Sequence, residues 1–213
     1  MRAARSIAGN PIAEGEHRQT LHQRTAGPLT AVLTFAVLFF IGYLIGIPAG
    51  RRGEETYGAA LAAFRMDKQN YAAFWTVYVR FLSGMFLQAT AVMLCGFHVG
   101  GSIFLGIFFA AKGILMGLCA SGVYLAQGVR GLVVHWLLSC LPDLGLLLLL
   151  LWLAGRAYLL SAGLIRCAFS GGRAGLTAPI RQLIVRYLIA VAVGAGANLV
   201  FAASAVLFAG VLL

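Results

Sequence analysis

Five long apolar stretches dominate this chain and limit what it can fold into. They lie near residues 29–47, 81–97, 102–126, 131–153 and 187–213. Each approaches the roughly 20 apolar residues that a helix needs to cross the hydrocarbon core of a bilayer. A segment in lipid must also satisfy its own backbone hydrogen bonds, which a helix does. We therefore predict an all-α polytopic bundle of about five transmembrane helices.

The overall composition agrees with a chain that is embedded in lipid. Apolar residues make up 61% of the 213 residues and charged residues only 10%, whereas a soluble domain carries about 25% charge. The formal net charge is +10, but the Lys and Arg residues lie between the apolar stretches. This distribution is typical of the signals that orient membrane proteins, and it argues against a nucleic-acid partner.

The basic residues also predict a topology for the polar tail, residues 1–28, and the bundle domain, residues 29–213. Four arginines lie in the tail, and a predicted loop before the last span carries Arg156, Arg166, Arg173 and Arg181. Four spans separate the two regions, so both should face the cytoplasm, with the chain crossing the membrane several times.

The first span, 29–47, is predicted to end at Pro48 and Gly50. A secretory signal peptide is the competing interpretation of this stretch. Its leading polar region is long, however, and no convincing small-residue cleavage site follows it. We therefore interpret the stretch as a retained membrane anchor.

Residues 51–80 form a long polar interruption in which aromatic residues recur at roughly helical spacing. This pattern predicts a helix on the outer membrane surface, with its rings at the level of the lipid headgroups. The helix is either a lead-in to the second span or a docking surface for a partner outside the membrane. The candidate docking residues are Tyr57, Leu61, Phe64, Tyr71 and Trp75.

Two charged residues lie deep within predicted spans, Lys112 in 102–126 and Asp143 in 131–153. Counting from the span ends places both roughly 15–18 Å into the hydrocarbon, so the two could pair between antiparallel helices. Such a pair is either structural or part of an ion or proton path, and Lys112 could instead extend to the interface. The adjacent Pro142 predicts a kink in the fourth span.

Small residues recur at four-residue spacing in three spans, which is typical of helices that approach closely in lipid. They are Gly42 and Gly46 in the first span, Gly113 and Gly117 in the third, and Ala190, Gly194 and Asn198 in the fifth. The pattern would either hold this bundle together or dock another membrane protein, including a second copy of the chain.

The sequence offers little equipment for catalysis. Its four histidines and four cysteines form no metal or redox motif, and no HExxH, GxSxG or phosphate-binding loop occurs. Asp143 is the only carboxylate within a predicted span. We therefore expect no cofactor, no metal and no enzymatic activity.

Four short motifs occur in an order that points to a family. They are Ala-Ala-Lys-Gly-Ile-Leu-Met-Gly at 110–117, Ser-Cys-Leu-Pro-Asp at 139–143, Glu-Glu-Thr-Tyr at 54–57, and the Arg-rich region before the last span. Together with the spacing of the spans, they resemble bacterial stage II sporulation protein M over roughly residues 29–213. In that family an asparagine or histidine often follows the proline, whereas Asp143 stands at the adjacent position here.

The resemblance implies a non-enzymatic membrane scaffold. Family members in spore formers act during engulfment with stage II sporulation proteins D and P, which cut septal peptidoglycan. The chain would then anchor those proteins in the sporulation septum of a sporulating host. The alternative, which rests on Lys112, Pro142 and Asp143, is a small permease or the membrane subunit of a transporter.

Overall fold

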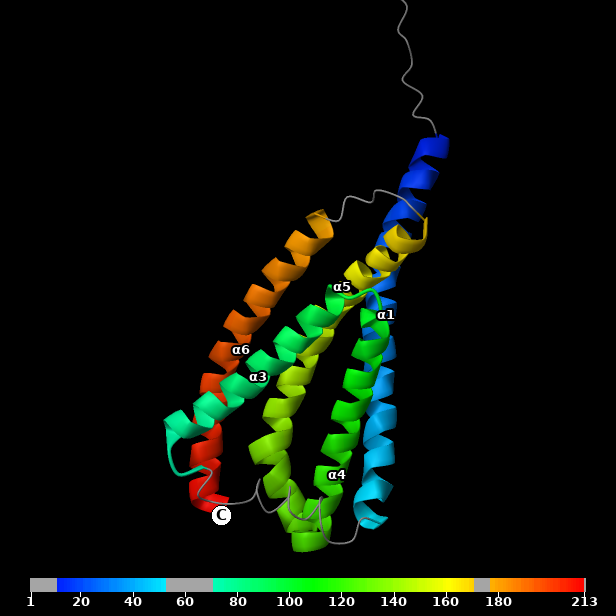
Figure 1. Cartoon of the computed structure of the whole chain (residues 1–213). Coiled ribbons are helices and arrows are strands. Elements are labelled where there is room, and N and C mark those ends of the chain that lie inside the picture. Colours follow the sequence, from blue (N-terminus) through cyan, green and yellow to red (C-terminus); the bar gives the residue numbers. More distant parts are fainter. Residues whose placement is uncertain (1–10, 53–70, 171–176, 213) are drawn as a thin grey trace, which may run out of the picture.

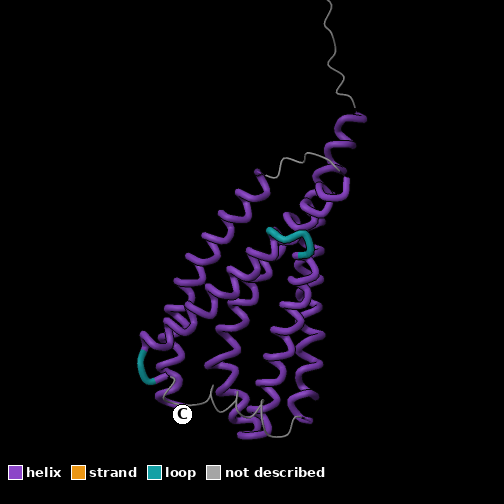
Figure 2. Tube along the Cα trace, in the orientation of Figure 1, coloured by secondary structure: helices purple, strands orange, loops and turns teal. Residues whose placement is uncertain are grey.

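Helices account for almost all of the residues that this computed structural model describes, which are 11–52, 71–170 and 177–212 (Figures 1 and 2). The helices are α1 (Pro11–Arg52), α3 (Phe74–Gly96), α4 (Gly101–His135), α5 (Leu141–Ser170) and α6 (Thr177–Leu212), and a π-helical segment, η2 (Trp136–Cys140), joins α4 to α5. Within the described residues the chain is therefore all-α, as its apolar stretches predicted.

Four helical stretches in the described part of the chain are long and apolar enough to cross a membrane. They are Pro28–Gly50, Phe74–Gly96, Gly101–Phe169 and Thr177–Gly210. The third stretch reverses direction at Gly128, whose φ of 65° and ψ of −155° interrupt α4, a conformation that glycine adopts easily. Figure 1 shows α4 running to one end of the bundle and α5 returning from it. The third stretch is thus long enough to cross twice, which agrees with the prediction of about five transmembrane helices.

The ends of the first two helices differ from the predicted spans. α1 already begins at Pro11 and continues through Pro48 to Arg52, and α3 begins at Phe74 and not at residue 81. A proline removes only its own N–H donor and does not force a helix to end. Hydropathy marks where a helix leaves the lipid, whereas the backbone hydrogen bonds continue beyond that point.

The predicted basic loop before the last span is wrong for the same reason. α5 continues to Ser170 and α6 begins at Thr177, so that Arg156, Arg166 and Arg181 lie on helices. Arg173 lies outside the described residues. Figure 1 shows the start of α1 and the connected ends of α5 and α6 at the same end of the bundle, as four intervening crossings require.

The α1 and α4 glycines pack against each other inside the bundle. A Cβ atom at Gly42 would overlap the carbonyl oxygen of Ala110, and one at Gly113 would overlap that of Phe39. The second glycine of each motif repeats the contact, Gly46 with Ile114 and Gly117 with Tyr43. These glycines therefore allow two backbones to touch, which is how helices associate in lipid.

The remaining helices complete the core around this pair. The rings of Phe35 on α1 and Phe109 on α4 are stacked with centroids 5.4 Å apart, and both side chains are buried. On the other side of the bundle α6 packs on α3, where a Cβ atom at Gly194 would overlap Met85 Sδ. All the predicted packing glycines thus lie at contacts between helices of one chain.

The turn between α3 and α4 lies between Gly96 and Gly101, at the gap between the predicted spans 81–97 and 102–126. The His98 carbonyl accepts a hydrogen bond from Ser161 Oγ at 3.0 Å. The same Ser161 oxygen accepts one from the Ser102 amide at 3.2 Å. Ser161 therefore ties this turn to α5 and satisfies backbone groups at the end of the bundle.

Replacing Gly113 by alanine should lower the free energy of unfolding by about 1–3 kcal/mol, because the added methyl group overlaps the Phe39 carbonyl. Gly196, whose Cβ position has no atom within 4 Å, is the matched control, and alanine there should be neutral or stabilise by up to about 1 kcal/mol. Thermal unfolding of the purified protein in detergent measures both. Equal melting temperatures would contradict the close α1–α4 contact.

Candidate functional site

Two adjoining cavities lie among α3, α4, α5 and α6 and share Gln88 and Asp143 in their linings. The first has a volume of about 210 Å³ and is lined by Tyr71, Arg80, Phe81, Gly84, Met85, Gln88, Ser139, Pro142, Asp143, Leu146 and Asn198. The second has a volume of about 310 Å³ and is lined by Gln88, Phe108, Ala111, Lys112, Leu115, Met116 and Asp143. We call the two together the polar cavity.

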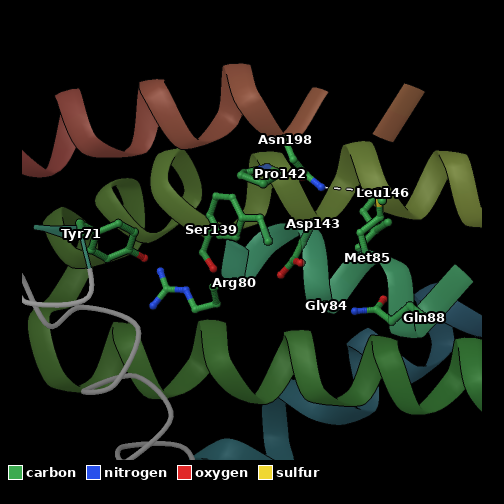
Figure 3. Close-up of a pocket in the computed structure, with 11 residues that line it drawn as sticks. Tyr71, Arg80, Gly84, Met85, Gln88, Ser139, Pro142, Asp143, Leu146 and Asn198 are labelled. Atoms are coloured by element: carbon green, nitrogen blue, oxygen red, sulfur yellow. Dashed lines mark hydrogen bonds between the residues drawn. The ribbon is translucent and has the colours of Figure 1, made fainter. Parts of the chain in front are cut away.

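Arg80 and Asp143 face the first of these spaces from different helices. Figure 3 shows the guanidinium of Arg80, from α3, on the side of Tyr71 and Ser139, with the carboxylate of Asp143 farther along the same space. The Arg80 Cζ atom lies 5.2 Å from the centroid of the Tyr71 ring and 5.7 Å from that of Phe81. These rings restrict the position of the guanidinium through cation–π attraction.

Lys112 reaches the second space from α4. Its Nζ atom donates a hydrogen bond of 2.7 Å to Gln88 Oε1 on α3, and Asp143 lines the same space. Lys112 and Asp143 thus lie around one cavity, which is compatible with their similar predicted depth, and their pairing stays a prediction. Sequence reasoning missed Gln88, although an amide in the otherwise apolar stretch 81–97 was the signal that could have found it.

The π-helical segment η2 ends at Cys140, just before Leu141 and Pro142. It explains how the helix accommodates this proline. The Leu141 amide bonds to the Trp136 carbonyl, five residues earlier, so the helix is widened by one residue at this turn. Pro142 has no N–H, and its ring would crowd the carbonyl four residues before it in a regular helix. The widened turn relieves this conflict. Such π-turns often occur at functional sites, and this one places Ser139 and Asp143 on the cavity.

The fifth span contributes Asn198, which is buried on α6. Its Nδ2 atom lies 3.5 Å from Met85 Sδ and donates a weak hydrogen bond to it (dashed line in Figure 3). Asn198 belongs to the small-residue face of α6 that packs on α3. A buried amide has four hydrogen-bonding positions, so Asn198 adds a polar wall to the cavity.

The candidate docking residues are divided by the structure. Trp75 is 68% exposed, whereas Tyr71 is only 4% exposed and packs in the bundle with Val77 and Leu138. The prediction that Tyr71 belongs to an exposed docking surface is therefore wrong. Tyr71 lies so close to the start of α3 that its ring packs in the interior of the bundle. Tyr57, Leu61 and Phe64 lie outside the described residues.

The charges of the polar cavity suit binding better than covalent chemistry. Among the described lining residues there are two cations, Arg80 and Lys112, and one carboxylate, Asp143. The remaining polar groups are amides and hydroxyls, which donate and accept hydrogen bonds. Such a set can hold a small polar or anionic molecule through charge and hydrogen bonds.

Comparison of the chain with known protein families, curated proteins and solved structures found no match.

A cysteine placed at Gly84 should react with a water-soluble thiol reagent at least about tenfold faster than one at Leu148, because a thiol ionises in water and not in lipid. Gly84 lines the cavity and has no atom within 4 Å of its Cβ position, whereas Leu148 is 69% exposed on the outer face of α5. Both variants are made after the four native cysteines are replaced by alanine. Labelling rates are measured in membranes, and equal rates would show that the cavity is dry.

Proposed function

We propose that this protein is a small permease, or the membrane subunit of a transporter, whose path runs through the polar cavity. The observation that carries the proposal is the position of Asp143, which lines both parts of the cavity. Arg80, Gln88 and Lys112 surround it from α3 and α4. Three ionisable side chains around one cavity are energetically costly in a bundle of apolar helices. Such residues within a membrane usually mark a functional site.

The shape of α5 supports the same proposal. Transport proteins commonly bind their substrates where a membrane helix is interrupted, because the irregular turn presents polar groups. Here the π-turn before Pro142 lies beside the cavity. Both parts of the cavity are large enough for several water molecules or a small solute.

The charges favour a small anion that moves together with a proton. Arg80 and Lys112 attract the anion, since opposite charge is strongly favoured where water is scarce. Asp143 is the carboxylate that takes up and releases the proton. The basic helix ends at one end of the bundle would face the cytoplasm of a bacterial cell.

Asp143→Asn should reduce proton-coupled flux about ten- to a hundredfold, because losing a charged hydrogen-bonding group costs about 1.5–3 kcal/mol. The purified protein is reconstituted in liposomes that contain a pH-sensitive dye, and gradients of potassium chloride, phosphate or succinate are applied. Ser83→Ala is the control, because Ser83 is an exposed residue of α3 whose hydroxyl bonds within its own helix to the Arg80 carbonyl.

Folding of each variant is verified by its elution profile in detergent. Flux in the wild type that Asp143→Asn leaves unchanged, in a protein that still elutes as a single species, would refute the role of the polar cavity. Absence of flux above empty liposomes for all three anions would direct attention to the second candidate function.

The second candidate is the non-enzymatic scaffold that the resemblance to stage II sporulation protein M implies. One structural observation favours it, the exposed aromatic group at the start of α3. The Trp75 ring packs edge-on against those of Phe74 and Tyr78, with centroids 5.4 Å and 6.0 Å away, and Trp75 itself is exposed. Rigid exposed aromatic rings are frequent at the centre of protein interfaces.

Trp75→Ala should lower the recovery of a bound peptidoglycan hydrolase about tenfold or more, since interface tryptophans often contribute 2 kcal/mol or more. The tagged protein is purified in detergent from membranes of its native host, sporulating where the host sporulates, and its partners are identified by mass spectrometry. Trp136→Ala, at another exposed tryptophan, is the matched control. A hydrolase recovered equally with both variants would refute this docking surface.

A further inference from the structure

Three arginines gather where α5 and α6 approach each other, at a site that shares no residue with the polar cavity. Arg156 comes from α5, and Arg181 and Arg186 come from α6. Together with Trp152 and Gln182 they line a pocket of about 690 Å³. Its described lining contains no carboxylate. Three guanidinium groups so close together repel one another unless an anion lies among them.

The arginines are held in place by neutral neighbours. The Arg186 Cζ atom lies 4.6 Å from the centroid of the Trp152 ring, a stacking that leaves the donors at the edge of the guanidinium for another acceptor. Arg156 Nη1 donates a hydrogen bond of 3.2 Å to Gln182 Oε1. Its Nε atom is enclosed and has no hydrogen-bond partner among the described residues. The edge of the Arg186 guanidinium, and not the enclosed Nε atom of Arg156, therefore remains for an incoming acceptor.

The position of the pocket along the helices places it at the level of the lipid headgroups. Arg156 follows the apolar stretch 131–153 within three residues, and Arg186 immediately precedes the stretch 187–213. Tryptophan and arginine are enriched at this depth in membrane proteins. The ends of these apolar stretches therefore indicate a depth near that of the lipid phosphates.

Two apolar residues extend the pocket toward the hydrocarbon. Val185 is 46% exposed and Ile189 is 47% exposed, and both belong to the pocket lining on α6. A free phosphate ion would gain nothing from these side chains. An amphiphile would gain from both parts, because its charged group meets the arginines and its acyl chain covers the apolar wall.

We propose that this pocket binds the phosphate of an anionic phospholipid, with Arg156, Arg181 and Arg186 as its ligands. Basic pockets between transmembrane helices are a recognised means of holding anionic lipid headgroups. The site does not depend on whether the protein transports a solute or anchors a partner. The bound lipid would join the ends of α5 and α6 and neutralise the charge there.

Native mass spectrometry of the full chain in detergent tests the proposal. The probes are phosphatidylglycerol, the zwitterionic lipid phosphatidylcholine, and inorganic phosphate. Wild type should bind phosphatidylglycerol about tenfold or more tightly than phosphatidylcholine, and Arg181→Gln should lose most of this preference. Arg181 is exposed, so its replacement should not disturb packing. Arg186→Lys, which retains the charge without the planar fork, should have an intermediate effect.

Arg130→Gln is the matched control, because Arg130 is an exposed arginine beside the Gly128 turn at the opposite end of the bundle. It removes the same charge and should leave the lipid preference unchanged. An equal loss in Arg130→Gln and Arg181→Gln would overturn the site and indicate attraction by net charge alone. Displacement of phosphatidylglycerol by an equal concentration of inorganic phosphate would overturn the assignment to lipid.

Discussion

The reciprocal glycine contact between α1 and α4 is the interaction on which the rest of the bundle depends. In lipid, apolar side chains gain little from leaving the solvent, so helix pairs rely on close packing. Gly42 and Gly113 let a carbonyl oxygen of the partner helix occupy the space of a missing side chain. This contact sets the rotation of α4 about its axis. Because Gly113 faces α1, the preceding residue, Lys112, is turned toward α3, where it meets Gln88.

The polar cavity follows from that rotation together with the π-helical turn that precedes Pro142 in the fourth crossing helix, α5. A regular helix through Pro142 would bring its ring against a carbonyl group, and the widened turn of η2 avoids this conflict. The same turn presents Asp143 to both parts of the cavity. Polar groups that would be very costly singly in hydrocarbon are placed where they can share partners and water. This arrangement is the ground for proposing a pathway through the cavity.

Sequence-based prediction and structure agree best for features that depend on one local property of the sequence. Apolar stretches long enough for the bilayer predicted the helices, the gap between the spans 81–97 and 102–126 predicted the turn between α3 and α4, and four-residue spacing predicted the packing faces. They disagree at the helix ends, where Arg156 and Arg181 lie on helices and not in a loop. Hydropathy reports the change of solvent, whereas a helix ends only where its backbone hydrogen bonds find other partners. Tyr71 was misplaced because spacing predicts a periodic face and not its environment.

From the sequence alone follow the fold class, the burial of charges in apolar helices, and the residues able to sustain close helix contacts, because lipid imposes hydrogen bonding and length on each helix separately. The sequence of a single helix does not determine which other helix it packs against, because this depends on how all the helix faces fit together at once. Only the packed bundle places Gln88 beside Lys112 and Arg186 beside Trp152. It also places Asp143 in the lining of both parts of the polar cavity. These contacts join residues that are 24 or more positions apart in the chain, and no local spacing rule encodes them.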